Sequence, residues 1–532
     1  MGWSALTVVS TARPESARTS HLAPRASHFA PSTSHLARRT ADDAAIIGKI
    51  KKAAIPISSP TPSASTKDLE PIGQFLKGVT VVGMGEPTHG TREVFQLKHR
   101  MFQYLVEKQG YTIFEIEASM AGCAAMEHYV STGEGDPAAA VVAQGFWTWS
   151  TEEVVSLIKW IRTYNADATH TKKLHVVGVD MQDREGTVDL IRNMLVRSGV
   201  KNEFTGDLNW FPSTRYKIGL EKTFAALSQI VTEALPAVTS KLGVNQATML
   251  TRLVRVTQQA QTLQERDVVN DDFTGARAEI MPILGEVVEN AAKLRADAKD
   301  LGPDALYGFD LLQLAKDNKL GEDYDAVRLR KGVAQLKEYA AAHKERERDF
   351  ANTLKVFEFL ALAREFIAAN KTNPRDLYMA ENVKWVTDTL YPGAKAMLWA
   401  HNYHVSRGPN ACGRELTRLF GERYYPIGFA FGSGSFQARS NDPESGLTAF
   451  TVDLTHAGDL DMNLHKVGLP VFFFSCATDS LAIWLNAPHT TRVLGAGYDP
   501  ANASLYTQPI TPAQLYRGMI YVDKTTRARP LK

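Results

Sequence analysis

Cysteine is scarce in this 532-residue chain, and no Cys-x-x-Cys pair occurs. The three cysteines are Cys123, Cys412 and Cys476. An odd number at such wide spacing argues against a disulfide framework and for a reducing compartment. Long apolar runs are missing too, because residues 467–485, the best candidate, are interrupted by Pro470 and Asp479. A membrane-spanning helix needs about 20 apolar residues, so we predict none in this chain.

A surplus of one charge sign is absent as well. The chain has 60 Lys and Arg residues and 58 Asp and Glu residues, a formal net charge of +2, and no basic stripe interleaved with aromatic residues. Such a stripe is typical of nucleic-acid-binding domains. We therefore expect neither nucleic acid nor a membrane as a partner, and a small or medium-sized neutral ligand fits this composition better.

Four common catalytic motifs do not occur in the sequence. They are the Gly-x-Ser-x-Gly elbow, the Gly-x-x-x-x-Gly-Lys-Ser/Thr phosphate loop, the His-Glu-x-x-His zinc helix and the Gly-x-Gly-x-x-Gly turn between a strand and a helix. A serine hydrolase of the usual type is therefore disfavoured. What the sequence offers instead is a set of histidine and carboxylate side chains.

The first 66 residues have low complexity. A Ser-His-Leu/Phe-Ala unit repeats every seven residues from Ser20, with prolines between the repeats, and a second proline-serine segment covers residues 55–66. We predict a disordered tail over residues 1–66, with the folded body beginning near Leu69 after a short helical lead-in. Its arginines and serines suggest an organellar presequence, but the helix expected of one is missing, so a cloning or start-site extension is equally compatible.

Strand and helix signals alternate after this tail. Apolar, β-branched runs predict strands at residues 79–84, 111–117 and 174–179, and later at 396–400, 425–431, 469–474 and 519–521. Helical spacing appears at residues 94–108, 121–130 and 151–165. Such alternation indicates an α/β sheet flanked by helices.

Strand signals vanish in the middle of the chain. Residues 211–373 are rich in Ala, Leu, Glu, Lys and Arg, with long helical stretches at 220–242 and 333–369. We predict an all-helical insertion there, which divides the α/β core into a first half, residues 67–210, and a second half, residues 374–532.

Ionisable side chains follow or close several predicted strands. They are Glu86 and His89, Glu115 and Glu117, Asp180, and His401 and His404. A buried charge needs a compensating partner, so we expect these groups to meet at one edge of the sheet and to compensate one another. A carboxylate that binds one imidazole nitrogen leaves the other free to accept a proton from water. His89 is therefore our candidate general base.

Other conspicuous residues have ordinary alternatives. Trp147, in the run Phe146-Trp147-Thr148-Trp149, is our candidate for the wall of an apolar substrate pocket, although core packing explains the run equally well. The segment Gly432–Ser435 has the flexibility of a ligand loop, and a simple turn is the preferred interpretation. His99 lies within a predicted helix and is interpreted as a core or solvated histidine.

Several motifs together resemble the erythromycin esterase family. They are Gly85-Glu-Pro-Thr-His-Gly-Thr-Arg-Glu93, Phe114-Glu-Ile-Glu-Ala118, Gly178-Val-Asp-Met-Gln182, Arg375-Asp-Leu-Tyr-Met-Ala-Glu-Asn382 and Trp399-Ala-His-Asn-Tyr-His404. The resemblance runs from about Pro71 to the C-terminal region. It implies a mixed α/β core with a helical region that closes over a cleft.

The resemblance also implies an activity and roles for site residues. Members of the family open the macrolactone ring of erythromycin-type antibiotics without a metal cofactor or a serine nucleophile, which confers antibiotic resistance. By this resemblance His89 activates water, Glu86 orients it, and Glu117 with His401 and His404 completes the charged cluster. Lys98 stands where members can carry an arginine. Lys98, His404, Arg375, Trp147 and Asp180 are the predicted substrate-binding residues.

The substrate remains open on the sequence alone, since nothing encodes a particular ring. One alternative is a metal-dependent hydrolase of another ester or lactone, because Glu86-x-x-His89 and His401-x-x-His404 have ligand-like spacing. A second is a non-enzymatic haem-binding protein, disfavoured because its lipid-anchored relatives carry a cysteine near the N-terminus. We expect a cytoplasmic location, and the oligomeric state is not predicted.

Overall fold

The computed structural model describes residues 44–62, 64–207, 210, 220–297, 300–317, 319–321, 323–344, 347–370, 373–440 and 445–531. The chain divides into two compact units, which are described separately. The core unit contains the described residues up to 210, residues 221–260 and residues 374–531. The helical unit contains the described residues of the range 261–373.

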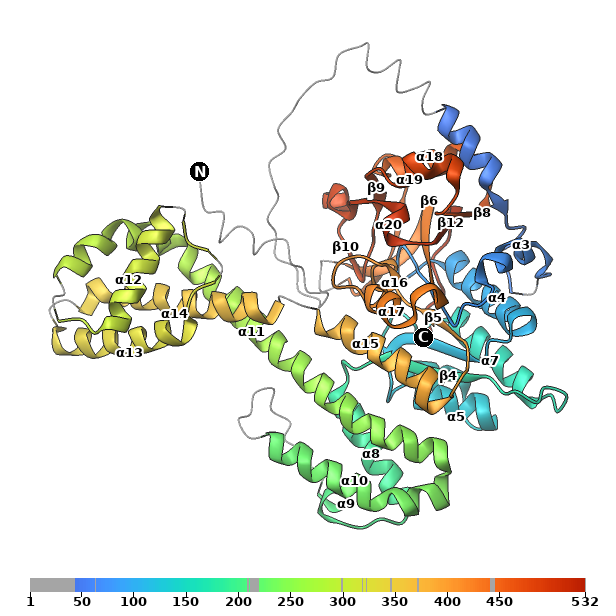
Figure 1. Ribbon diagram of the computed structural model, residues 1–532, viewed down its shortest axis with the longest axis horizontal. Coiled ribbons are helices and arrows are strands. Elements are labelled where there is room, and N and C mark those ends of the chain that lie inside the picture. Colours follow the sequence, from blue (N-terminus) through green and yellow to red (C-terminus); the bar gives the residue numbers. More distant parts are fainter. Residues whose placement is uncertain are drawn as a thin grey trace. The chain divides into compact units, whose positions relative to one another are not determined.

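A ten-stranded mixed sheet forms the centre of the core unit (Figure 1). Its main path has the order β1-β8-β12-β6-β2-β5-β3-β4, and β7 and β10 pair with β6 outside this path. The strands are β1 (Ile55–Pro56), β2 (Val81–Met84), β3 (Ile113–Ser119), β4 (His175–Asp180), β5 (Ala396–Trp399), β6 (Tyr424–Ser440), β7 (Leu447–Val452), β8 (Val471–Ser475), β10 (Gly497–Tyr498) and β12 (Gly518–Thr525). A separate two-stranded sheet contains β9 (His489–Arg492) and β11 (Thr507–Ile510).

The central strands β6, β2, β5, β3 and β4 are parallel to one another. Every residue of β2, β3 and β5 is buried, as expected for parallel strands covered on both faces. The predicted α/β class with a mixed sheet is confirmed. All seven predicted strands are present, with boundaries shifted by a few residues and with β6 extended far beyond its predicted end.

Helices surround this sheet. Those of the core unit are α3 (Glu70–Gly73), α4 (Arg92–Gln109), α5 (Ala124–Thr132), α6 (Pro137–Val142), α7 (Glu152–Ala166), α8 (Arg184–Arg197), α9 (Glu203–Gly206), α10 (Leu220–Leu242), the first part of α11 (Val244–Asp297), α15 (Pro374–Trp385), α16 (Asn402–Val405), α17 (Cys412–Phe420), α18 (Asp459–Lys466), α19 (Ala482–Leu485) and α20 (Pro512–Leu515). Within the described residues, no helix is long and apolar enough to span a membrane.

The two faces of the sheet carry different helices. Alternate side chains of a strand point to opposite faces, and Phe114 and Ile116 of β3 belong to the large apolar cluster with α4, α5 and α7. Ile113, on the other face, packs with residues that follow α15. Glu115 and Glu117 share that second face, where α15 and α17 contact each other.

The predicted helical insertion is present, but its limits differ from residues 211–373. The helical unit contains the rest of α11, from Gln261, together with α12 (Pro303–Lys316), α13 (Ala326–Ala342) and α14 (Glu347–Asn370). Residues 221–260 belong to the core unit, and residues 211–219 lie outside the described residues. The helical stretch predicted at 333–369 contains most of α13 and nearly all of α14. That the insertion closes over a cleft stays a prediction.

The segment Gly432–Ser435, for which we predicted a turn rather than a ligand loop, is neither of these and forms part of β6. It pairs with β12 on one side, and its last two residues pair with β7 on the other. A Cβ atom at Gly434 would lie 2.0 Å from the carbonyl oxygen of Thr525, and the backbone has φ of +135° there. Glycine is therefore required by close strand approach rather than by flexibility.

The predicted disordered tail is wrong for its last part. Residues 1–43 lie outside the described residues, whereas residues 44–53 form a helix and β1 pairs with β8. The fully buried Arg100 of α4 holds the following segment, since its guanidinium binds Asp68, the carbonyl oxygen of Ser59 at 2.6 Å and that of Ser65. The ordered body therefore includes the proline-serine segment, whose polar backbone groups Arg100 satisfies.

Arg100→Met should destabilise the protein without touching the sheet. The variant leaves Asp68, which is 19% exposed, and two carbonyl oxygens without their common donor, and loss of a partner by such groups costs about 1–3 kcal/mol. We expect a lower free energy of unfolding in urea titrations. An unchanged free energy would show that the segment is held by other contacts.

Candidate active site

Four neighbouring strands deliver ionisable groups to one edge of the sheet. Their order is β2-β5-β3-β4, and all are parallel, so their carboxyl ends lie together. Glu86 follows β2, His401 follows β5, Glu117 lies near the end of β3 and Asp180 ends β4. The arrangement expected from the sequence is therefore present, and it is the position where α/β sheets bind ligands.

His89 and Glu86 form a buried dyad. Nδ1 of His89 lies 2.7 Å from Oε1 of Glu86, whose side chain is fully buried, and His89 is 5% exposed. Nδ1–H donates to the carboxylate in this pair, so Nε2 is the nitrogen that can accept a proton. The sharp turn before the dyad requires glycine, because a Cβ atom at Gly85 would lie 2.2 Å from Oδ1 of Asn402.

Two further donors hold the second oxygen of Glu86. Lys98 Nζ donates to Oε2 at 2.7 Å and Trp399 Nε1 donates at 2.9 Å. Burial lowers the pKa of Lys98 to about 8, although the carboxylates of Glu86 and Glu117 oppose this shift. Lys98 is fully buried, so the predicted contact with substrate does not fit its position. It holds the carboxylate that orients His89.

Trp149 packs against the candidate base and was missed by the sequence analysis. Its ring meets the His89 ring edge-on, with centroids 5.5 Å apart, and its Nε1 donates to the carbonyl oxygen of Glu117 at 2.9 Å. The predicted pocket residue was Trp147, which is only half-buried, whereas the rings that pack against His89 within the described residues are those of Trp149 and His401. The pair Trp147 and Trp149 was the sequence signal for an aromatic residue at the site, but the sequence does not show which of the two is buried.

A second dyad consists of His404 and Asp376. Nδ1 of His404 lies 2.8 Å from Oδ1 of Asp376, and Nε2 lies 3.2 Å from Oε1 of Glu117. Burial disfavours the charged imidazole, but Asp376 and Glu117 outweigh it and raise the pKa of His404 well above its usual range. The two neighbouring carboxylates therefore favour the protonated form of His404. Asp376 was not predicted, although it follows Arg375 in a quoted motif.

Glu117 joins the two halves of the site. Burial opposes its ionisation, yet His404, Arg375 and His89 together hold its pKa well below the usual range. Its Oε2 accepts from the backbone N–H of His401 at 2.9 Å. Because this amide belongs to the N-cap residue of α16, Glu117 also fixes the start of that helix.

Arg375 binds both carboxylates that end β3 and β4. Its Nη2 donates to Glu117 Oε1 at 2.7 Å and to Asp180 Oδ2 at 2.8 Å. Its Nη1 lies 3.2 Å from Nε2 of His404. Asp180 is fully buried and points to Arg375, so it positions this guanidinium rather than lying open to a ligand.

His401 lies beside the candidate base. The two imidazole centroids are 4.9 Å apart. Nδ1 of His401 accepts from the backbone N–H of Tyr403 at 3.3 Å and caps α16. An accepting Nδ1 places the proton on Nε2, so His401 is a hydrogen-bond donor where His89 is an acceptor.

Glu115 does not join the cluster. It is fully buried, burial raises its pKa well above the usual range, and neither carboxyl oxygen has a hydrogen-bond partner within the described residues. Among those same residues, no group of three or more His, Cys, Asp or Glu side chains is placed to hold a metal ion.

The fold and the site define an α/β protein with a histidine–carboxylate centre at the carboxyl edge of a mixed sheet. The chain belongs to the erythromycin esterase family, since the family model described as Erythromycin esterase matches residues 106–525. The matched range includes Glu117, Asp180, Arg375, His401 and His404 and begins after His89.

Similar proteins agree with this assignment. YbfO of Bacillus subtilis (strain 168) is 23% identical over 87% of this chain and 88% of its own length. The name given to that protein describes it as a hydrolase. Erythromycin esterase type II of Escherichia coli is 24% identical over 26% of this chain and 32% of its own length. A solved Bacillus cereus structure shares the fold, with a TM-score of 0.54, 20% identity and coverage of 92% of this chain and 99% of that one. Family membership and these names indicate a hydrolase.

Proposed function

We propose that this protein is an ester hydrolase that opens the lactone ring of a macrolide of the erythromycin type, with His89 as the general base. The observation that carries the proposal is the buried His89–Glu86 dyad, with Nδ1 and Oε1 2.7 Å apart, beside the charged pair of His404 and Glu117. The family description and the name of the Escherichia coli relative support a macrolide as substrate.

The reaction needs only water and the ester. Nε2 of His89 accepts a proton from water while the water oxygen attacks the ester carbonyl, which gives a tetrahedral oxyanion. The oxyanion collapses, the bond to the ring alkoxide breaks, and the alkoxide receives a proton from the His89 imidazolium. The product is a ring-opened hydroxy acid. General base catalysis of this kind contributes about 10²–10⁴ in rate.

Positive charge for the oxyanion comes from His404 and Arg375 in this proposal. Both cations adjoin Glu117, and a preorganised donor of this kind contributes about 3 to 4 kcal/mol to transition-state stabilisation. Lys98, the other cation proposed from the sequence, binds Glu86 at 2.7 Å and serves the His89–Glu86 dyad in this proposal. No serine nucleophile takes part. We propose the cytoplasm as the location, which the scarcity of cysteine supports.

The test is mass spectrometry of erythromycin incubated with the protein, with His89→Ala and with chelator-treated protein. We expect a gain of one water that is lost in the variant and kept with chelator. A gain that chelator abolishes would instead support the metal-dependent hydrolase. Unchanged erythromycin in the presence of folded protein would reject the macrolide, and a panel of other lactones and esters would then identify the substrate class.

Asp376→Asn should move the alkaline limb of the pH profile. His404 is active as a cation in this proposal, so kcat/KM falls as pH rises through its raised pKa. Asparagine keeps the acceptor for His404 Nδ1 and for the backbone N–H of Cys412, which lies 2.6 Å from Oδ1, but removes the charge that stabilises the imidazolium most. We expect the limb to move to lower pH by about one to three units. A limb at the wild-type position would show that His404 is not the titrating group.

A further inference from the structure

The last residues of the chain lie across the starts of two helices. We call residues 526–531, which follow β12, the C-terminal strap. The backbone N–H of Ala528 donates to the carbonyl oxygen of Gly90 at 2.9 Å, and the N–H of Arg92 donates to the carbonyl oxygen of Thr526 at 2.9 Å. Thr91 and Arg527 form an antiparallel bridge between these bonds. The strap is therefore joined to the loop that carries His89.

The same strap is joined to the start of α7. The backbone N–H of Glu152 donates to the carbonyl oxygen of Arg529 at 2.8 Å, and the N–H of Leu531 donates to that of Ser150 at 2.9 Å. Thr151 and Pro530 form a second antiparallel bridge. The first N–H groups of a helix have no partner within it, and here the strap supplies partners for those of α4 and α7.

Both loops adjoin the candidate base. Gly90 follows His89 directly, and Ser150 follows Trp149, whose ring packs edge-on against the His89 ring. The N-cap residue of α4, Thr91, makes no side-chain cap, so the strap replaces the usual support for this helix start.

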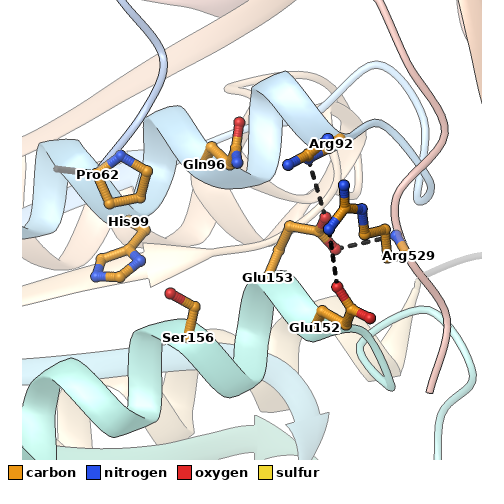
Figure 2. Close-up of a pocket in the computed structure, with 8 residues that line it drawn as sticks. All are labelled: Pro62, Arg92, Gln96, His99, Glu152, Glu153, Ser156 and Arg529. Carbon is orange, nitrogen blue, oxygen red and sulfur yellow. Dashed lines mark hydrogen bonds and ion pairs between the residues drawn. The ribbon is translucent and has the colours of Figure 1, made fainter. Parts of the chain in front are cut away.

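Side chains add weaker contacts between the strap and the starts of α4 and α7. Figure 2 shows the residues that make them, Arg92, Glu152, Glu153 and Arg529. Nη1 of Arg529 lies 3.3 Å from Glu152, and the backbone N–H of Arg529 donates to Glu153 at 3.1 Å. Arg92 lies 3.5 Å from Glu153. The Arg529 and Glu152 side chains are more than half exposed, and exposed ion pairs contribute little. The backbone bonds are therefore the main link.

We propose that the C-terminal strap is a positioning element for the catalytic base. It sets the distance between the Gly90 loop and the Ser150 loop, so that Trp149 keeps the His89 ring on Glu86. The kinetic part of this inference rests on the proposed function. The conformational part does not, because the His89–Glu86 hydrogen bond exists without substrate.

Two variants test the strap. One ends at Thr525. The other is Ala528→Pro, which removes the N–H that donates to Gly90 and leaves Gln437 as the remaining backbone donor to that carbonyl oxygen. Arg529→Ala is the matched control, since it removes a side chain of the strap and keeps every backbone bond. Thermal melting identifies any variant that does not fold. If the chain that ends at Thr525 does not fold, Ala528→Pro is the variant that tests the inference.

Two measurements separate positioning from folding. Imidazole NMR on protein labelled with ¹⁵N-histidine, with His89 assigned through His89→Gln, reports the Nδ1–H bond to Glu86. We expect this signal to broaden or vanish in both variants and to persist in Arg529→Ala. With a lactone substrate we expect kcat to fall about 10- to 100-fold, as small misplacements of catalytic groups do, with KM nearly unchanged.

The outcomes are distinguishable. An unchanged His89 signal in folded strap variants would overturn the inference, whatever the substrate. Unchanged kcat in those variants would overturn it as well. An inactive wild-type protein with a strap-dependent His89 signal would reject the proposed function while supporting the strap as the element that positions His89.

Discussion

Replacing His89 by alanine should lower lactone turnover by at least about 10²-fold, the scale of general base catalysis. The variant should still fold, because Glu86 retains two donors, Lys98 at 2.7 Å and Trp399 at 2.9 Å. Turnover is measured as kcat with the substrate identified by mass spectrometry, and folding by circular dichroism and thermal melting.

The chain offers a matched control for this variant. His175 and Glu127 form a similar histidine–carboxylate pair, with Nδ1 and Oε1 2.8 Å apart, at the amino end of β4 and away from the cluster. His175→Ala should keep kcat within about twofold, because this partly buried pair lies at the opposite end of β4 from Asp180 and takes no part in the proposed reaction. Retained turnover in His89→Ala would remove His89 as the base. Equal losses in both variants would indicate a general effect of losing such a pair.

Arg375→Met should be the most destabilising substitution in the site. It removes the guanidinium that binds Glu117 at 2.7 Å and Asp180 at 2.8 Å and leaves two buried carboxylates close together. Breaking a buried ion pair by removing one partner costs about 3–5 kcal/mol. We expect the free energy of unfolding in urea to fall on this scale, and kcat to fall with it because Glu117 no longer keeps its position.

A second substitution should restore part of the loss. Arg375→Met/Asp180→Asn removes one of the two carboxylate charges that Arg375 balances, so it should be more stable than Arg375→Met alone. Arg418→Met, which breaks an exposed pair with Glu415 on α17, should leave the unfolding midpoint unchanged. If Arg375→Met is as stable as the wild type, the carboxylates do not depend on Arg375 for their charge balance.

The sequence was sufficient to predict the position of the site because an ionisable residue marks the end of each apolar strand run. Glu86, Asp180 and His401 follow or close apolar runs directly, and in parallel strands such positions share one edge. Lys98 also shows the limit of this reasoning. Its helical position is clear from the sequence, but only the structure shows that the side chain points to Glu86 and is fully buried.

Asp376 was beyond the reach of the strand pattern. It lies in the first turn of α15, with no strand before it, and its partner His404 is 28 positions away. Periodicity predicts which face of a helix is apolar and does not predict a single polar contact between two helices. The prediction of a turn at Gly432–Ser435 was wrong for a related reason. Local glycine content suggests a turn, whereas pairing with distant strands keeps β6 extended.

The position of β2 in the sheet determines when this site can form during synthesis. The strand that leads to His89 pairs with β5 and β6, and the bonds of Glu86 to Trp399 and of Glu117 to His401 span 313 and 284 positions. Contacts this distant in sequence slow folding. The apolar strands β2 and β3 leave the ribosome long before their neighbours exist, and such unpaired strands aggregate readily. We expect soluble yield to depend on chaperones and on slow translation at low temperature.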